Sequence, residues 1–133
     1  MIRLLYIDAD PEMCAFISAF CERMEQIQVQ TLGSGEAALE WLLSSPADVI
    51  ASDYLFPRGI NGLTLISRLH IRGDRTPFIL FTADNSRSLK EEADQNGVFK
   101  VVSRTRQGKN PVLNLIRTVC WAATCRDKKD GCT

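Results

Sequence analysis

The stretch ADVIASDYLFP (residues 47–57) places one carboxylate, Asp53, directly after a short apolar run, and a proline, Pro57, four residues later. A run of this kind predicts a buried strand that ends in an acid. In open α/β sheets, ligands bind at the carboxyl ends of the strands, because loops and helix N-termini meet there. Asp53 is therefore the first candidate for a functional residue.

Two other strand-like runs also end in polar side chains. Residues 3–7 lead into Asp8 and Asp10, and residues 77–81 lead into Thr82. Because the carboxyl ends of parallel strands lie at one edge of a sheet, we expect these side chains to meet the acid that ends the first run.

The apolar pattern alternates between strand-like and helix-like segments along the whole chain. The predicted strands cover residues 3–7, 27–32, 47–52, 77–81 and 98–103, and the predicted helices begin near residues 11, 36, 63, 87 and 111. Five such β-α units predict an α/β fold, a doubly wound five-stranded parallel sheet with helices on both faces. The polar strand ends favour the flavodoxin-like strand order 2-1-3-4-5. We expect one domain over residues 1–123 and a polar C-terminal tail over residues 124–133.

The composition excludes several classes of partner. Sixteen basic residues balance sixteen acidic ones, so no direct binding to nucleic acid or to an anionic membrane surface is expected. Apolar runs are far shorter than the roughly 20 residues of a membrane span, and Met1 leads straight into a strand pattern. We expect a soluble, cytoplasmic protein. The cysteines lack metal-binding spacing, which predicts packing roles.

Several carboxylates gathered in one shallow site favour a bound cation, and hard oxygen ligands suit Mg²⁺. A carboxylate beside such a cation is able to attack a phosphoryl group and form an acyl phosphate. The sequence therefore predicts a magnesium-assisted phosphoryl site with Asp53 as the nucleophile.

Four segments of the chain, in order and on the expected elements, resemble the receiver domain of two-component response regulators. The resemblance covers residues 2 to about 123, and its segments are LLYIDADP (4–11), SGEAAL (34–39), PADVIASD (46–53) and TPFILFTA (76–83). Pro57 and the Asn61-Gly62 pair extend the third match.

The resemblance implies a phosphoacceptor function. Asp53 would accept a phosphoryl group from a histidine kinase or phosphotransfer protein, and the Thr82 hydroxyl would bind the phosphoryl oxygens. Mg²⁺ would be held by Asp8, Asp10, Asp53 and the backbone carbonyl of Leu55. Such a protein is not an enzyme beyond its own phosphoryl transfer and autodephosphorylation.

The sequence departs from the family pattern at three positions. Ala9 stands where a second acid usually binds the metal, Val101 stands at the switching aromatic, and Arg104 stands at the phosphate-binding lysine. Lys100 is a second candidate for that cation, but strand alternation places it two residues below the loop, so Arg104 is favoured. An arginine does not simply replace a lysine, because its guanidinium is longer and planar.

Three simpler interpretations remain open. Asp10 precedes Pro11 and is a ready helix N-cap without any metal role. The three departures also suit a degenerate receiver-like scaffold that binds protein and is never phosphorylated. A haloacid dehalogenase-like phosphatase would use Asp8 as nucleophile, but the Thr or Val expected two residues after Asp10 is missing, as is a later acidic pair.

The predicted fourth helix is polar, with Leu89 and Ala93 as its only clear apolar anchors. A thinly anchored helix repacks at low cost. We therefore expect the face formed by the fourth helix, fifth strand and last helix to contact an output domain or a second copy of the chain.

Overall fold

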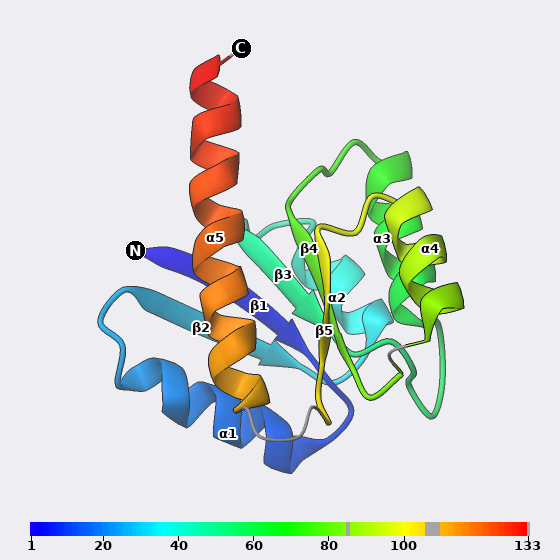
Figure 1. Cartoon of the computed structure of the whole chain (residues 1–133), viewed down its shortest axis with the longest axis horizontal. Coiled ribbons are helices and arrows are strands. Elements are labelled where there is room, and N and C mark those ends of the chain that lie inside the picture. The colour runs from blue at the N-terminus through cyan, green and yellow to red at the C-terminus, as the bar shows by residue number, and fades with distance from the viewer. Residues whose placement is uncertain (85, 106–109, 133) are drawn as a thin grey trace.

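A computed structural model of the chain describes residues 1–84, 86–105 and 110–132, with only the backbone described from residue 126 onward. Strands and helices alternate throughout (Figure 1). The strands are β1 (Ile2–Ile7), β2 (Ile27–Leu32), β3 (Val49–Ser52), β4 (Phe78–Thr82) and β5 (Lys100–Ser103). The helices are α1 (Pro11–Glu22), α2 (Gly35–Trp41), α3 (Gly62–Ile71), α4 (Arg87–Gln95) and α5 (Pro111–Cys132).

The strands form one parallel sheet in the order β2-β1-β3-β4-β5, which confirms the predicted fold class and strand order. The order reverses direction at β1, so β1 and β3 lie side by side at the switch point. Ile7 pairs with Ser52 there, and the backbone N–H of Asp53 donates to the carbonyl of Ile7 at 2.9 Å. Asp53 therefore ends the central strand beside the end of β1.

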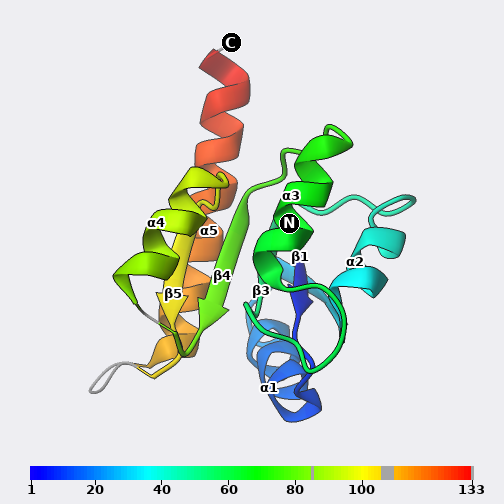
Figure 2. The same cartoon turned by 90° about the vertical axis from the view of Figure 1, so that its right-hand side faces the viewer.

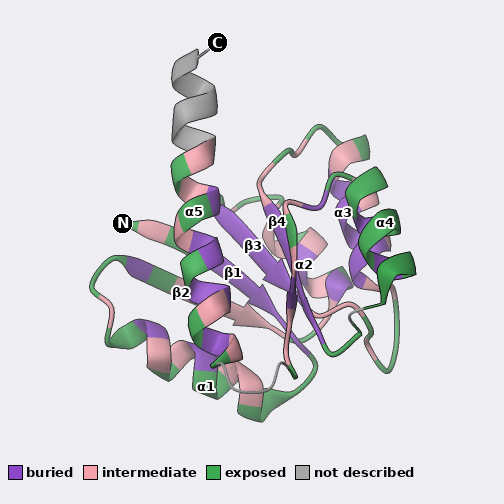
Figure 3. Cartoon of the chain, in the orientation of Figure 1, coloured by how far each residue is buried: buried purple, intermediate pink, exposed green. Residues whose placement is uncertain are grey.

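Helices cover both faces of the sheet and form two apolar cores (Figure 1). Alternate residues of the strands pack on α1 and α5 on one face, and the intervening residues pack on α2, α3 and α4 on the other. The bodies of β1, β3 and β4 are buried, while α4 turns mostly exposed residues outward (Figure 3). A site for a ligand is therefore expected at the carboxyl ends of the strands.

Side-chain caps fix where four of the helices begin. Asp10, Ser34, Asn61 and Ser86 each accept a hydrogen bond from a backbone N–H in the first turn of the following helix. Such caps satisfy donors that have no partner inside the helix. Because Asn61 begins α3 and Asp10 begins α1, the loops that follow β3 and β1 have fixed ends.

The last helix is longer than the sequence suggested. The sequence predicted a polar tail after residue 123, but α5 continues to Cys132 and projects beyond the body of the domain (Figure 2). No proline interrupts residues 112–132, and alanine, arginine and lysine after residue 121 all favour helix. The predicted boundary between residues 123 and 124 thus lies inside a helix. None of the helices described is both long and apolar enough to cross a membrane.

Candidate functional site at the carboxyl edge of the sheet

Asp53 lies at the carboxyl end of β3 with 23% of its side chain exposed. Its Oδ1 atom accepts a hydrogen bond from the backbone N–H of Tyr54 at 2.7 Å, and its Oδ2 atom lies 3.6 Å from Nη2 of Arg104. Burial raises the pKa of the Asp53 carboxyl, although the Arg104 charge and the Tyr54 N–H act in the opposite direction. One oxygen of this carboxylate is thus fixed by the backbone and the other faces a cation.

Asp8, at the end of β1, is almost completely buried, with 2% of its side chain exposed. Its Oδ2 atom accepts hydrogen bonds from the Tyr6 hydroxyl at 2.6 Å and from Nη2 of Arg104 at 2.6 Å. Its Oδ1 atom accepts a hydrogen bond from the backbone N–H of Asp10 at 2.9 Å. Both oxygens of Asp8 are therefore engaged by protein donors.

Arg104 follows β5 and connects the three strand ends. Its backbone N–H donates to the Thr82 carbonyl at 3.0 Å, which keeps the residue beside the end of β4. Its Nε donates to the Phe81 carbonyl at 2.8 Å, and its guanidinium carbon lies 4.7 Å from the centre of the Phe81 ring. The guanidinium is thus held on one side by Phe81 and on the other by Asp8.

Lys100, the second candidate cation, lies elsewhere. It is exposed, and its Nζ atom is 5.4 Å from the ring centre of Trp121 on α5. Of the two candidates, Arg104 alone contacts the candidate site.

Tyr6 and Phe81 belong to the site and were missed from the sequence. The Tyr6 hydroxyl also accepts a hydrogen bond from Nη2 of Arg104 at 3.2 Å. The rings of Tyr6 and Phe81 pack edge to face, with their centres 6.4 Å apart. A tyrosine inside an apolar strand needs a partner for its hydroxyl, and strand alternation places it on the same face as Asp8, two residues on. That signal was available for Tyr6 but not for Phe81.

Charge coupling inside this group favours a permanently charged guanidinium. Burial lowers the pKa of Arg104, but the neighbouring Tyr6, Asp53 and Asp8 groups outweigh it, and the net shift is upward. Burial, and then the hydrogen bond to Asp8, raise the pKa of Tyr6, so its hydroxyl stays protonated.

The remaining predicted site residues, Thr82, Asp10 and Leu55, lie at the same edge of the sheet. The side chains of Thr82 and Asp10 accept hydrogen bonds from nearby backbone N–H groups. The Thr82 hydroxyl accepts the backbone N–H of Asp84 at 3.2 Å. The Asp10 carboxylate accepts the N–H of Glu12 at 2.9 Å, so it caps α1 as the simpler interpretation held. Leu55 lies in the loop after Asp53 and is 62% exposed.

The arrangement does not fit a Mg²⁺ site. Mg²⁺ needs near-octahedral oxygen ligands, and it usually takes one or two carboxylates that are open to it. Here Asp8 is engaged at both oxygens, Asp10 caps a helix, and Ala9 supplies no ligand. Within the described ranges, no group of three or more acidic, histidine or cysteine side chains is placed to hold a metal.

Residues 4–111 match the family model of the response regulator receiver domain. The chain belongs to this family. Receiver domains are the receiving modules of two-component signalling systems, and this chain is therefore such a module.

Curated relatives of the domain are longer proteins. The heme response regulator HssR of Staphylococcus epidermidis strain RP62A is 33% identical over 108 residues, which cover 78% of this chain and 45% of that protein. HssR of Staphylococcus aureus strain Newman is 30% identical over 115 residues, which cover 86% of this chain and 50% of that protein. The chain spans about half the length of the curated relatives it matches.

Solved structures share the fold at lower sequence identity. The receiver domain of the Francisella response regulator 1452 has a TM-score of 0.84 at 23% identity, covering 95% of this chain and 99% of that one. The chemotaxis response regulator CheY4 of Vibrio cholerae has a TM-score of 0.76 at 22% identity, covering 90% and 98%. These likenesses support the flavodoxin-like fold.

Proposed function

We propose that the chain is a phosphoacceptor and that Asp53 takes the phosphoryl group from a histidine kinase or a phosphotransfer protein. The observation that carries the proposal is the position of Asp53 Oδ2, which is partly exposed at the end of the central strand and faces a guanidinium at 3.6 Å. Asp8 is a poor acceptor by comparison, because it is buried and both its oxygens accept hydrogen bonds.

The chemistry is an in-line displacement. An oxygen of the Asp53 carboxylate forms a bond to phosphorus as the phosphorus–nitrogen bond of a phosphohistidine breaks, and the imidazole leaves with that electron pair. Negative charge then gathers on the phosphoryl oxygens. Arg104, 3.6 Å from Asp53, would stabilise that charge, and the Thr82 hydroxyl would add a hydrogen bond by turning away from the Asp84 N–H.

Receiver domains generally take up the phosphoryl group with Mg²⁺. The corresponding ligands here are Asp8, Asp10, Asp53 and the Leu55 carbonyl, and this set stays a prediction. A cytoplasmic location stays a prediction as well.

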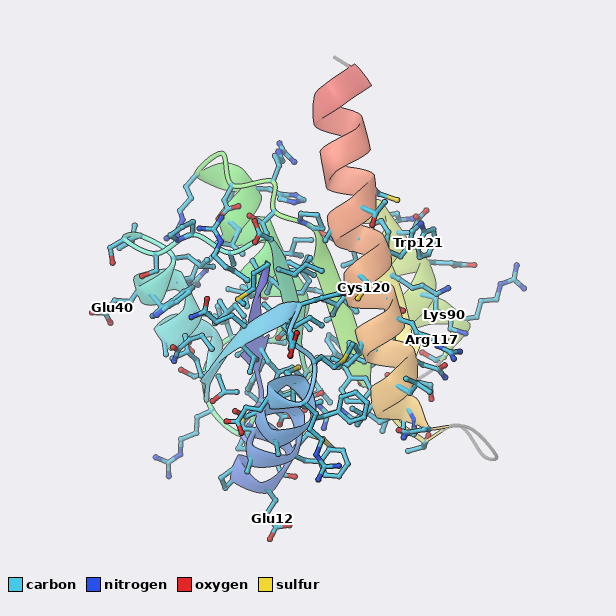
Figure 4. The ribbon with its side chains drawn as sticks, turned by 90° about the vertical axis from the view of Figure 1, so that its left-hand side faces the viewer. Glu12, Glu40, Lys90, Arg117, Cys120 and Trp121 are labelled. Atoms are coloured by element: carbon cyan, nitrogen blue, oxygen red, sulfur yellow. The ribbon has the colours of Figure 1, made fainter. Side chains whose placement is uncertain are left out.

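Output is proposed to run through the face formed by α4, β5 and α5. Leu89 and Ala93 are the buried residues of α4, as predicted, so few contacts resist its movement. On α5, Trp121 is 52% exposed and packs on Phe99 at 4.9 Å between ring centres. In Figure 4, Trp121 and Arg117 on α5 and Lys90 on α4 point to the same side of the view, where a partner or an output domain would contact them.

Intact mass after incubation with acetyl phosphate and excess Mg²⁺ tests the proposal. The wild-type protein should gain one phosphoryl group, and Asp53→Asn should gain none. Absence of any gain in the wild type would favour the alternative, a degenerate receiver-like scaffold that works without phosphorylation. A gain that survives in Asp53→Asn and disappears in Asp8→Asn would favour the phosphatase-like chemistry.

A further inference from the structure

We infer that the guanidinium of Arg104 is the resident cation of this site and that it takes the place of a divalent metal ion. A single atom, Nη2 of Arg104, lies 2.6 Å from Asp8 Oδ2 and 3.6 Å from Asp53 Oδ2. These two carboxylates are the ones between which a metal ion would have to lie. The positive charge is already there, on a side chain that belongs to the chain itself.

Several contacts fix the position of the Arg104 guanidinium. Arg104 approaches from β5, and four groups besides Asp53 hold it: the Asp8 carboxylate, the Tyr6 hydroxyl, the Phe81 carbonyl and the Phe81 ring. Only 15% of the Arg104 side chain is exposed. A side chain fixed by this many contacts loses several charge-assisted or buried interactions if it leaves.

The same contacts act against a metal ion. A Mg²⁺ ion bound to Asp8 and Asp53 would sit about 2 Å from their oxygens, within a few ångströms of the guanidinium, and the two cations would repel. Mg²⁺ is also reluctant to give up its water, so it does not displace a buried ion pair readily. Ala9 fits this interpretation, since a methyl group there removes a hard ligand that a metal site would use.

The structure thus gives two of the three residues that depart from the family pattern, Ala9 and Arg104, one shared role. Ala9 removes a charged metal ligand, and Arg104 supplies a positive charge. A lysine at this position would be shorter and would carry its charge on one nitrogen, so it could not donate to both Asp8 and the Phe81 carbonyl as the guanidinium does. Under the proposed function, Asp53 would then be phosphorylated without a metal ion.

Calorimetric titration of Mg²⁺ into metal-free protein tests the inference directly, without relying on phosphorylation. Wild-type protein should bind Mg²⁺ at least about tenfold more weakly than Arg104→Met, a variant that keeps an unbranched apolar stem and removes the charge. Arg3→Met is the matched control, because Arg3 pairs with Asp48 at 3.1 Å at the opposite end of β1. It should behave as the wild type does. Saturable binding to the wild type that equals binding to Arg104→Met would overturn the inference.

A second measurement on the wild type keeps the inference testable if Arg104→Met does not fold. Labelling by acetyl phosphate should proceed at the same rate, within about twofold, in chelator and in excess Mg²⁺. Labelling that occurs only with Mg²⁺ would overturn the inference and leave the proposed function standing. Absence of labelling in both conditions would contradict the proposed function, while Mg²⁺ titration of the wild type still decides whether the site takes a metal.

Discussion

Arg104 and Asp8 are 96 residues apart in the sequence, and their side chains meet at 2.6 Å in a nearly buried ion pair. A buried pair is not in itself strong evidence of stability, because both charges have lost water. Removing one partner is nevertheless costly, since the other charge stays buried. This asymmetry makes the pair accessible to measurement.

Arg104→Met should lower the free energy of unfolding by about 3 kcal/mol, because it leaves the Asp8 carboxylate buried without its cation. Arg3→Met removes a more exposed pair with Asp48 and should cost much less, because water screens that pair. Urea unfolding of the two variants and the wild type provides the comparison. Equal losses in the two variants would mean that the contact with Asp8 has no special role in the fold.

Ala9→Asp should tighten Mg²⁺ binding relative to the wild type, because it adds a hard ligand beside Asp8 and Asp53. It also crowds acidic groups together, so the metal-free protein should melt at a lower temperature than the wild type does. Thermal melts in chelator and in excess Mg²⁺ measure both effects. Unchanged metal affinity would show that position 9 is not what limits binding.

Phosphorylation of Asp53 should change amide hydrogen exchange within residues 84–110, since α4 is held by only two buried residues, Leu89 and Ala93. Val101 has no aromatic ring that could move together with Thr82. The change in exchange should therefore be smaller than in a receiver domain whose aromatic side chain at this position moves with the threonine. Exchange followed by mass spectrometry, before and after acetyl phosphate, tests this. A change confined to residues 27–45 would place the output surface on another face.

The contact between Glu36 and the loop at Ile60 should depend on pH. The hydrogen bond from the Ile60 N–H, at 2.9 Å, lowers the pKa of Glu36 by favouring its charged form. A lowered pKa in the folded state means that this contact stabilises the loop above the unfolded pKa and that the contribution is lost as pH falls through the folded value. A carboxyl NMR titration should give a lower midpoint for the protein than for a peptide of residues 34–42. Equal midpoints would contradict the contact.

The sequence predicted most of the fold because its signals are local. Apolar patterns located the ten elements that the structure describes, and a cap such as Asp10 is readable from one residue and its neighbours. The end of α5 was predicted wrongly, because a polar segment was taken for a tail although its residues favour helix.

The candidate site was only partly predictable. Strand alternation favoured Arg104 over Lys100, and the strand ends brought Asp8, Asp53 and Thr82 to one edge, where Arg104 also lies. The ion pair itself joins β1 to β5 across the sheet, and no local pattern encodes such a contact. That both oxygens of Asp8 are already engaged therefore had to come from the structure.

The most direct test of the central claim is to locate the phosphoryl group. After treatment with acetyl phosphate, borohydride reduces an aspartyl phosphate to homoserine, and peptide mass spectrometry identifies the residue changed. The account predicts homoserine at position 53 and none at positions 8 or 10. Homoserine at position 8, or a labelled protein with an unchanged residue 53, would contradict it.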